Sequence, residues 1–359
     1  MNGFGAAPLR TGVLGCGAIA HEHLEYLESS PLADLVSVGD RSPAARRFAA
    51  DRYRVPATDA EAPDLLARDI DVVHICTPPA THPALVAMAL EAGVNVVCEK
   101  PLAPSADAAG ELLELAASRG LMLVESQNLR WNDPVLAIDR LAGSGRLGEV
   151  RDVEVSLWFD LTDGPFGDPN LTGPGVDLPA GAVHDFLPHL SYLFLHHAGH
   201  SGSVDEVVGR LENLSGNPRV GYDHLDALIV AGSVRGRIRV CSDVAPDGFR
   251  IAVRGTRGGV ETDLYQPYLR LQDEGDTGIG APIEQLWSGL RLVGASVTNL
   301  GGKVLRHGGY HGIPRMLEAV YTAIATGGPS PVPPSWILST ALLNDRLAGL
   351  ATDRTEAPS

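Results

Sequence analysis

Two short stretches of the sequence hold side chains that could move protons or bind a polar substrate. The first is Glu99, Lys100 and Pro101, which stand directly after the apolar run 94–98. An ammonium is rarely buried without a partner, so a lysine at the end of an apolar strand is expected to serve a site. There it could hydrogen-bond a hydroxyl and, beside another positive charge that lowers its pKa, take part in proton transfer. A surface lysine in a turn is the alternative that the composition leaves open.

The second stretch is the segment 181–189, in which Asp185 and His189 are four positions apart. On a helix this spacing puts both side chains on one face. A histidine assisted by a carboxylate is a natural acid/base for moving a hydroxyl proton. A solvated helix face is the alternative for such a pair, and the neighbouring His184 adds a further candidate. A metal site built from these three residues lacks further ligands, so we predict no metal.

Glycines near the N-terminus form a pattern typical of dinucleotide binding. The sequence G-V-L-G-C-G-A-I-A contains G-x-G-x-x-A between an apolar run and a helical stretch. Gly15 permits the tight turn, Gly17 lets a pyrophosphate approach the backbone, and Ala20 allows close packing of helix and strand. Asp40 closes the next apolar run, near the expected acidic residue that hydrogen-bonds the ribose. Its carboxylate would repel a 2'-phosphate and so favours NAD, while the adjacent Arg41 keeps NADP open.

Polar residues at other expected strand ends complete the cofactor prediction. The segment from Cys76 to His82 reads C-T-P-P-A-T-H and follows an apolar run, and open α/β sheets bind ligands at the carboxyl ends of their strands. His82 could equally be a polar residue at the start of the following helix. We predict that the cofactor is NAD or, alternatively, NADP. The residues predicted to contact it are Gly15, Gly17, Ala18, Ile19, Asp40, Arg41, Thr77, Pro78, His82, Glu99, Lys100 and Gln127.

The first third of the chain alternates apolar runs with helical stretches, which is typical of a doubly wound parallel sheet. Ser42 and Pro43 are expected to cap and begin one of the helices. The expected strands are 12–14, 35–38, 72–75, 94–98 and 121–124, and the expected helices are 18–29, 42–54, 83–92 and 105–119.

After about residue 128, longer alternating segments with Gly-containing turns indicate an α/β domain with an open, mostly antiparallel sheet and a few helices. The loop 160–180 is long enough to be expected to cover a site. We predict a dinucleotide-binding Rossmann domain at 1–128, a substrate-binding and oligomerisation domain at 129–350 and a disordered tail at 351–359. In the second domain, strands are expected at 150–159, 204–214, 227–234, 237–242 and 249–254, and helices at 182–197, 312–326 and 336–350.

Composition and charge narrow the class of protein. The 359 residues suffice for two domains, and 28 basic against 44 acidic residues give a formal charge of −16 that disfavours nucleic acid. No apolar stretch reaches the roughly 18 residues of a membrane helix, and the N-terminus lacks the pattern of a secretory signal. Four widely spaced cysteines without a C-x-x-C pair fit buried thiols in a reducing compartment. We therefore predict a cytoplasmic protein that acts on a small molecule, without nucleic-acid or membrane partners.

Together these motifs resemble the glucose-fructose oxidoreductase / inositol dehydrogenase family (Gfo/Idh/MocA), and the similarity spans almost the entire chain. The resemblance rests on the glycine turn with Asp40, the T-P-P-x-x-H segment, Glu-Lys-Pro at 99–101 and the spacing of Asp185 and His189. The stretch Q-N-L-R-W-N-D-P also looks like that family's link between domains.

The resemblance implies a Rossmann domain followed by an α/β domain whose open sheet often makes an oligomer contact, here in a dimer or tetramer. It also implies NAD(P)-dependent oxidation or reduction of sugars, polyols and related alcohols. By motif match, Lys100 would be the active-site lysine, His189 the acid/base and Asp185 the carboxylate beside it. Leu187 and His184 depart from the family's usual glycine and aliphatic residue, which bears on the shape of the substrate.

We expect hydride transfer between the C4 atom of nicotinamide and a carbinol or keto carbon of a sugar, inositol or glycoside. Two alternatives stay open. One is an NAD-dependent glycoside hydrolase that uses redox chemistry transiently, and the other is a catalytically silent, cofactor-sensing protein of the same fold.

Overall fold

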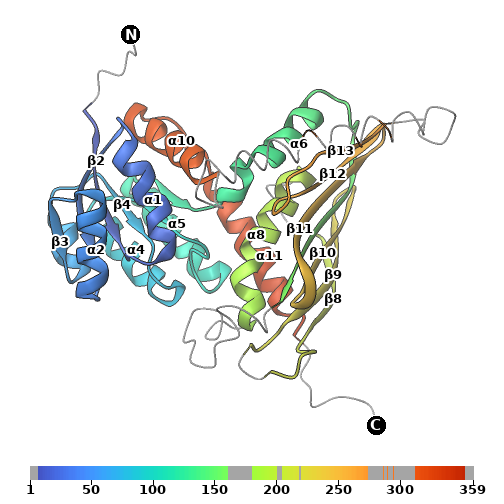
Figure 1. Cartoon of the computed structure of the whole chain (residues 1–359), viewed down its shortest axis with the longest axis horizontal. Helices are drawn as coiled ribbons and strands as arrows, with labels where there is room; N and C mark the ends of the chain where they lie inside the picture. Colours follow the sequence, from blue (N-terminus) through green and yellow to red (C-terminus); the bar gives the residue numbers. More distant parts are fainter. Residues whose placement is uncertain are drawn as a thin grey trace. The chain divides into compact units, whose positions relative to one another are not determined.

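The computed structural model describes residues 7–160, 180–199, 204–217, 220–273 and 312–351, together with Leu286, Gly289 and Gly294. The chain divides into two compact units (Figure 1). The first consists of Met1–Trp131 and Tyr310–Leu342, and the second of Asn132–Gly309 and Leu343–Ser359. The predicted loop 160–180 lies outside the described residues from 161 to 179, and the predicted tail does so from 352 onward.

The first unit is built on a parallel sheet, as predicted, and the sheet has six strands. Its strand order is β3-β2-β1-β4-β5-β6, so the order reverses between β1 and β4, where doubly wound sheets bind their ligands. The strands are β1 (Leu9–Leu14), β2 (Ala33–Gly39), β3 (Ala57–Asp59), β4 (Val72–Ile75), β5 (Asn95–Cys98) and β6 (Leu123–Glu125). Helices α1 (Ala18–Ser29), α2 (Pro43–Tyr53), α3 (Ala62–Leu66), α4 (His82–Glu91) and α5 (Ala106–Arg119) connect them.

Local signals account for most of these elements. The Ser42 hydroxyl accepts the Ala45 N–H at the start of α2, with Pro43 as the first helical residue, which confirms the predicted cap. Strand β4 is buried along its whole length, as an interior parallel strand requires. Elements β3 and α3 were not predicted, because segments of three and five residues are too short to show a periodicity.

Helix α10 (Gly312–Thr326) belongs to the first unit, although the sequence placed it in the second domain. Its buried face includes Met316, Leu317 and Val320, which are part of the same hydrophobic core as the parallel sheet. The helix packs against α1, beside which it is drawn in Figure 1. The contacts therefore correct the predicted boundary for Tyr310–Leu342, and helix α11 (Pro334–Ala348) runs from one unit into the other.

The second unit contains a seven-stranded sheet in the order β13-β12-β11-β7-β10-β9-β8. Neighbouring strands are antiparallel except β7 and β10, which are parallel, so the predicted mostly antiparallel sheet is confirmed. Helix α8 (Gly181–Ala198) packs against β7, β9 and β10, and α6 (Asp133–Gly143) precedes the sheet. The strands are β7 (Val150–Asp160), β8 (Glu206–Glu212), β9 (His224–Ala231), β10 (Val234–Cys241), β11 (Asp243–Gly255), β12 (Gly258–Asp263) and β13 (Arg270–Asp273).

Among the described residues, none of the helices combines the length and apolar character that crossing a membrane requires.

The place of α10 in the first core can be tested with Leu317→Ala. Leu317 is fully buried, so the substitution should lower the free energy of unfolding by about 2–5 kcal/mol through lost burial and a cavity. Leu342→Ala is the matched control, because that leucine is 47% exposed and its loss should cost no more than about 0.5 kcal/mol. Equal effects of the two substitutions in urea unfolding would contradict the assignment.

Candidate active site

The turn between β1 and α1 has the shape that a dinucleotide phosphate needs. Gly15 has a φ of +88°, and a Cβ built there would lie 2.7 Å from backbone atoms of Cys76 and Thr77, so only glycine fits. Gly17 is the N-cap residue of α1, and a Cβ there would meet nothing within 4 Å. Gly17 and Ala18 are exposed, so the first N–H groups of the helix face open space where an anion could bind.

The Asp40 carboxylate is held beside this turn at the end of β2. Its Oδ2 accepts the Cys16 N–H at 2.8 Å, and its Oδ1 accepts the Ser42 N–H at 2.7 Å. Each carboxylate oxygen has a second lone-pair site with which it could accept a ribose hydroxyl. Arg46 donates to the Asp40 carbonyl, whereas Arg41 is exposed. The turn and the carboxylate therefore fit the adenosine half of NAD.

His82 joins the loops that follow β4 and β5. The ring is fully buried at the start of α4, with Nε2 2.8 Å from the Thr77 carbonyl oxygen and Nδ1 2.7 Å from that of Pro101. Burial lowers the pKa of His82, against the opposite effect of the two carbonyl acceptors. Thr77 is half-buried and Pro78 is exposed on the same loop. The structure thus shows His82 linking the two loops, and its contact with a cofactor stays a prediction.

Charged groups gather at the turn that carries Lys100. Glu99 is 6% exposed, and one of its carboxylate oxygens lies 3.0 Å from His23 Nε2 while the other accepts the Lys100 N–H at 3.3 Å. Burial alone would raise the pKa of Glu99, but the His23 hydrogen bond and charge, with a smaller effect of Lys100, lower it to about 2. Lys100 is half-buried, and its peptide bond to Pro101 is cis.

Glu125, at the end of β6, is a second buried carboxyl beside this turn. It accepts the Leu102 N–H at 2.9 Å and lies within hydrogen-bond distance of the Gln127 amide, at 3.1 Å. Burial and then the charge of Glu99 raise the pKa of Glu125. The edge of the sheet therefore holds two carboxyl groups whose pKa values are pushed in opposite directions, a combination that recurs in acid/base sites.

Gln127, also predicted to contact the cofactor, is 1% exposed. Its Nε2 donates to Glu125 and to the Thr340 hydroxyl, and its Oε1 accepts from Arg130 at 3.1 Å. The Arg130 guanidinium in turn stacks on the Trp336 ring, 3.7 Å from its centroid. The structure therefore places the Gln127 carboxamide in an internal network of the first unit.

The predicted acid/base pair lies on α8 in the second unit. Asp185 is half-buried, and His189 is 9% exposed with Nδ1 2.6 Å from the Tyr192 hydroxyl. The helix carries the two residues about one turn apart, as their spacing predicts. His184 is buried and accepts the Ala180 N–H at 3.4 Å, which places it at the start of the helix.

The structure brings the residues of the first unit together at one edge of the parallel sheet. Gly15, Thr77 and Lys100 follow β1, β4 and β5, which are neighbours in the sheet, and Asp40 follows the adjacent β2. Asp185 and His189 belong to the other unit, so their approach to Lys100 stays a prediction. Sequence reasoning missed His23 and Glu125, although the position of Glu125 at a strand end is a signal that could have found it.

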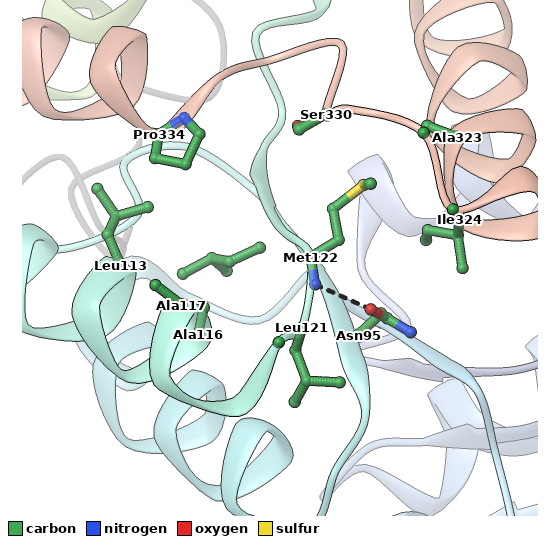
Figure 2. A pocket seen from close by; sticks show the side chains of 14 residues that line it. Asn95, Leu113, Ala116, Ala117, Leu121, Met122, Ala323, Ile324, Ser330 and Pro334 are labelled. Carbon is green, nitrogen blue, oxygen red and sulfur yellow. Dashed lines mark hydrogen bonds between the residues drawn. The ribbon is translucent and has the colours of Figure 1, made fainter.

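An apolar pocket of about 520 Å³ lies at the opposite edge of the same sheet (Figure 2). Its lining includes Asn95 and Leu121 at the amino ends of β5 and β6, and Ala323 on α10. The Asn95 side chain accepts the Met122 N–H at 2.9 Å, as the dashed line shows. The pocket is therefore separate from the carboxyl edge that carries Gly15 and Lys100.

Another histidine cluster links α6 to α8. His196 Nε2 lies 2.8 Å from Asp139 Oδ1, and His197 Nδ1 lies 3.8 Å from the same oxygen. These three residues could bring ligand atoms within 4.8 Å of one another, but the short contact between His196 and the carboxylate is already explained as a hydrogen bond between two helices.

Comparison with known proteins gives this geometry a context. Residues 9–127 match a family model described as "Oxidoreductase family, NAD-binding Rossmann fold", under the name GFO_IDH_MocA. The chain is 35% identical over 279 residues to a dTDP-3,4-didehydro-2,6-dideoxy-alpha-D-glucose 3-reductase from Saccharopolyspora spinosa, covering 72% of this chain and 83% of that protein. It is 28% identical over 265 residues to an inositol 2-dehydrogenase from Rhizobium meliloti, covering 72% and 77%.

Other matches are shorter or concern the fold alone. An uncharacterized oxidoreductase from Schizosaccharomyces pombe and a 3-reductase from Streptomyces violaceoruber are matched over only 42% and 44% of their own lengths. Among solved structures, an oxidoreductase domain protein from Kribbella flavida superposes with a TM-score of 0.79 at 22% identity, covering 96% of this chain and 97% of that one. This likeness shows a shared fold.

The steric requirement at position 15 can be tested with Gly15→Ala. The new Cβ would meet backbone atoms that cannot swing aside, so NAD affinity measured by calorimetry should fall at least about tenfold and stability should also fall. Gly93→Ala is the matched control, since Gly93 also has a positive φ, of +82°, but open space around it, and should cost only about 1–2 kcal/mol. Unchanged NAD binding in Gly15→Ala would contradict the role of the turn.

The lowered pKa of Glu99 predicts a dependence of stability on pH. Because the folded pKa, about 2, lies below the ordinary value of 4.5, this carboxylate stabilises the fold above about pH 4.5, and the contribution is lost as the pH falls toward 2. Glu99→Gln should therefore be less stable at pH 7 and lose less stability between pH 6 and about pH 3, measured by urea unfolding. The exposed Glu111→Gln is the control and should keep the wild-type slope. An identical slope in Glu99→Gln would argue against a charged Glu99.

Proposed function

Because the chain belongs to the Gfo/Idh/MocA family of oxidoreductases, we propose that it transfers a hydride between the C4 atom of NAD and a carbinol or keto carbon of a sugar, inositol or glycoside. The observation that carries the proposal is the common edge shared by Gly15, Thr77 and Lys100. They follow three neighbouring strands, β1, β4 and β5, so the phosphate turn and the lysine turn are two strand spacings apart, roughly 10 Å. A dinucleotide is long enough to bridge that separation.

The cofactor supplies the acceptor or donor of the hydride. In the oxidative direction the carbinol C–H bond breaks with its electron pair, while the hydroxyl proton leaves to the imidazole of His189 and a carbonyl forms. Lys100 donates a hydrogen bond to the same oxygen and stabilises the negative charge that develops there. Asp185 orients the imidazole or binds a neighbouring hydroxyl of the substrate.

A sugar-like substrate is supported by the names of the relatives. One is named as a dTDP-3,4-didehydro-2,6-dideoxy-alpha-D-glucose 3-reductase and another as an inositol 2-dehydrogenase, so both names refer to reduction or oxidation of a sugar or an inositol. Preference for NAD over NADP is supported by Asp40, whose carboxylate would face a 2'-phosphate with like charge. Arg46, which could neutralise a phosphate, already donates to the Asp40 carbonyl.

The outer face of the second sheet supports assembly into a homo-oligomer. Val208 on β8 and Leu228 on β9 are directly opposite each other in the antiparallel pair, and their side chains are 48% and 56% exposed. A paired apolar patch on a sheet face is a surface that another copy could cover. The four cysteines are free thiols, which fits the reducing cytoplasm that we propose as the location.

Removal of either group that acts on the substrate oxygen should slow catalysis more than it weakens cofactor binding. With NAD and a panel of polyols and sugars, Lys100→Met and His189→Ala should each lower kcat by about two to four orders of magnitude. Arg119→Met is the control, because Arg119 is an exposed cation bonded to the Glu91 carbonyl, and it should retain wild-type turnover.

Absorbance of the reduced cofactor is the primary measurement, and NAD binding is checked separately by calorimetry. Bound NAD without turnover of any sugar-like alcohol or ketone by the wild type would contradict the proposal. If a glycoside is turned over without net reduction of the cofactor, and deuterium from the solvent enters the sugar, the reaction is hydrolysis with transient redox chemistry and not dehydrogenation.

A further inference from the structure

A continuous chain of buried hydrogen bonds crosses the core of the first unit and ends at Glu99. His23 Nε2 lies 3.0 Å from Glu99 Oε1, and His23 Nδ1 lies 2.8 Å from His74 Nδ1. On the far side, His74 Nε2 lies 2.9 Å from the Tyr321 hydroxyl, which lies 2.9 Å from Thr11 Oγ1. Four of these five residues have no exposed surface, and Glu99 is 6% exposed.

The positions of the protons in this chain follow from its far end. The Thr11 hydroxyl donates its single proton to the Leu9 carbonyl at 3.0 Å, so it must accept from Tyr321. The Tyr321 oxygen then accepts from His74 Nε2. Burial lowers the pKa of His74 strongly, so that ring is neutral and its Nδ1 carries a lone pair.

Both nitrogens of His23 must therefore donate. Nδ1 donates to the lone pair of His74, and Nε2 donates to a carboxylate oxygen of Glu99, which only accepts. A ring with two N–H groups is an imidazolium. The reversed chain, with a neutral His23, would require Thr11 to give up its bond to Leu9 and would leave the Glu99 carboxylate without its buried counter-charge.

A positive charge on His23 would explain why the Glu99 carboxyl group stays ionised in this core. Removing a carboxylate from water is costly unless a partner of opposite charge is close, and breaking such a pair leaves one charge uncompensated. Among the described residues, the ionisable groups near His23 include Glu99 after β5, Glu22 on the same helix and the neutral His74 on β4.

The ion pair links two functional segments. His23 lies on α1, the helix that begins at the dinucleotide turn, while the second oxygen of Glu99 accepts the Lys100 N–H. On the other side of Lys100, the Pro101 carbonyl is held by His82. The backbone of the lysine turn is thus held on one side by His23, through the Glu99 carboxylate, and on the other side by His82.

We propose that His23 is a positioning residue for Lys100: a buried imidazolium that, through Glu99, fixes the lysine turn to the helix at the dinucleotide turn. The catalytic consequence rests on the proposed function of Lys100, whereas the protonation and the hold on the turn do not. The backbone amide of Lys100 can be observed selectively by lysine labelling, because the chain contains only two lysines, Lys100 and Lys303.

The protonation is tested on the full chain labelled with ¹⁵N-histidine. Imidazole ¹⁵N spectra at pH 8, where an exposed histidine is neutral, should include the signals of a ring with both nitrogens protonated that disappear in His23→Gln, whatever the state of His82 and His224, whose nitrogens also face acceptors. Tyr26→Phe is the matched control, because it removes a buried polar contact from the same helix, to Glu318, without touching the ion pair. A His23 ring in which only one nitrogen carries a proton would overturn the inference that this ring is an imidazolium.

The hold on the lysine turn is tested with ¹⁵N-lysine, which yields two backbone amide signals, assigned with Lys303→Arg. In His23→Gln the Lys100 amide should exchange with solvent at least about tenfold faster, while Tyr26→Phe should change the rate less than about twofold. If His23→Gln does not fold, Glu99→Gln removes the same pair and should also speed the exchange of the Lys100 amide with solvent. A Lys100 amide that keeps its wild-type exchange rate in these variants would overturn the positioning role.

Kinetics separate this inference from the proposed function. With an identified substrate, His23→Gln should lower kcat about 10- to 100-fold, because the lysine is no longer held in place. The KM for NAD should stay within about twofold of the wild-type value, because the glycine turn is unchanged. Equal loss of kcat in Tyr26→Phe would reduce His23 to a general structural role and so overturn the inference. If the ¹⁵N spectra are as expected but the wild-type protein turns over no substrate, the result would contradict the proposed function and leave the role of His23 standing.

Discussion

The close passage of two backbone segments at the carboxyl edge of the parallel sheet is the constraint on which the site depends. The turn after β1 runs so near the start of the loop after β4 that Gly15 has no room for a side chain. This proximity follows from the strand order, since β1 and β4 are neighbours at the point where the order reverses. Helix α1, capped by Gly17, begins at this edge, and the N–H groups of its first turn are the kind of site that binds an anion.

Buried charge is the second feature of this edge. Glu99, Glu125 and His23 are almost completely inaccessible to solvent, and each lies within hydrogen-bond distance of specific protein groups. The two carboxyl groups respond differently because the contacts with His23 outweigh burial at Glu99, whereas at Glu125 burial and the charge of Glu99 outweigh its hydrogen bonds and the charge of Lys100. Lys100 is half-buried, and its charge acts to lower the pKa of both carboxyl groups. Fixed charges of this kind are the condition for the electrostatic catalysis that we propose for this lysine.

The division into two units assigns different tasks to different parts of the chain. The first unit contains the dinucleotide turn and the lysine, and the matched family model covers 9–127 within it. The second contributes α8, with its histidine and aspartate, and a broad sheet with an exposed apolar pair. The similarity to a sugar reductase and an inositol dehydrogenase extends over both units, whereas shorter matches cover less than half of the relatives' length.

Local signals in the sequence predicted the elements that are long or capped. The cap at Ser42, the buried strand 72–75, the bounds of α10 and the helix that carries Asp185 and His189 all depend on residues within a few positions of one another. The turn at Gly15 and the ligand-binding edge were predictable for the same reason, because strand, glycines and helix are consecutive. Membership of α10 in the first unit was not predictable, since its apolar face would fit either core.

Tertiary structure alone decided the partners of the buried polar groups. His23 meets Glu99 across 76 positions of sequence, and His74 meets Tyr321 across 247, so no spacing pattern connects them. The fold gives each buried histidine different partners: the nitrogens of His23 meet another imidazole and a carboxylate, whereas those of His82 meet two backbone carbonyls. The sequence determined which residues could take part in chemistry at this edge. Their protonation and support were determined by the folded core, because hydrogen bonds are specified by position in space rather than along the chain.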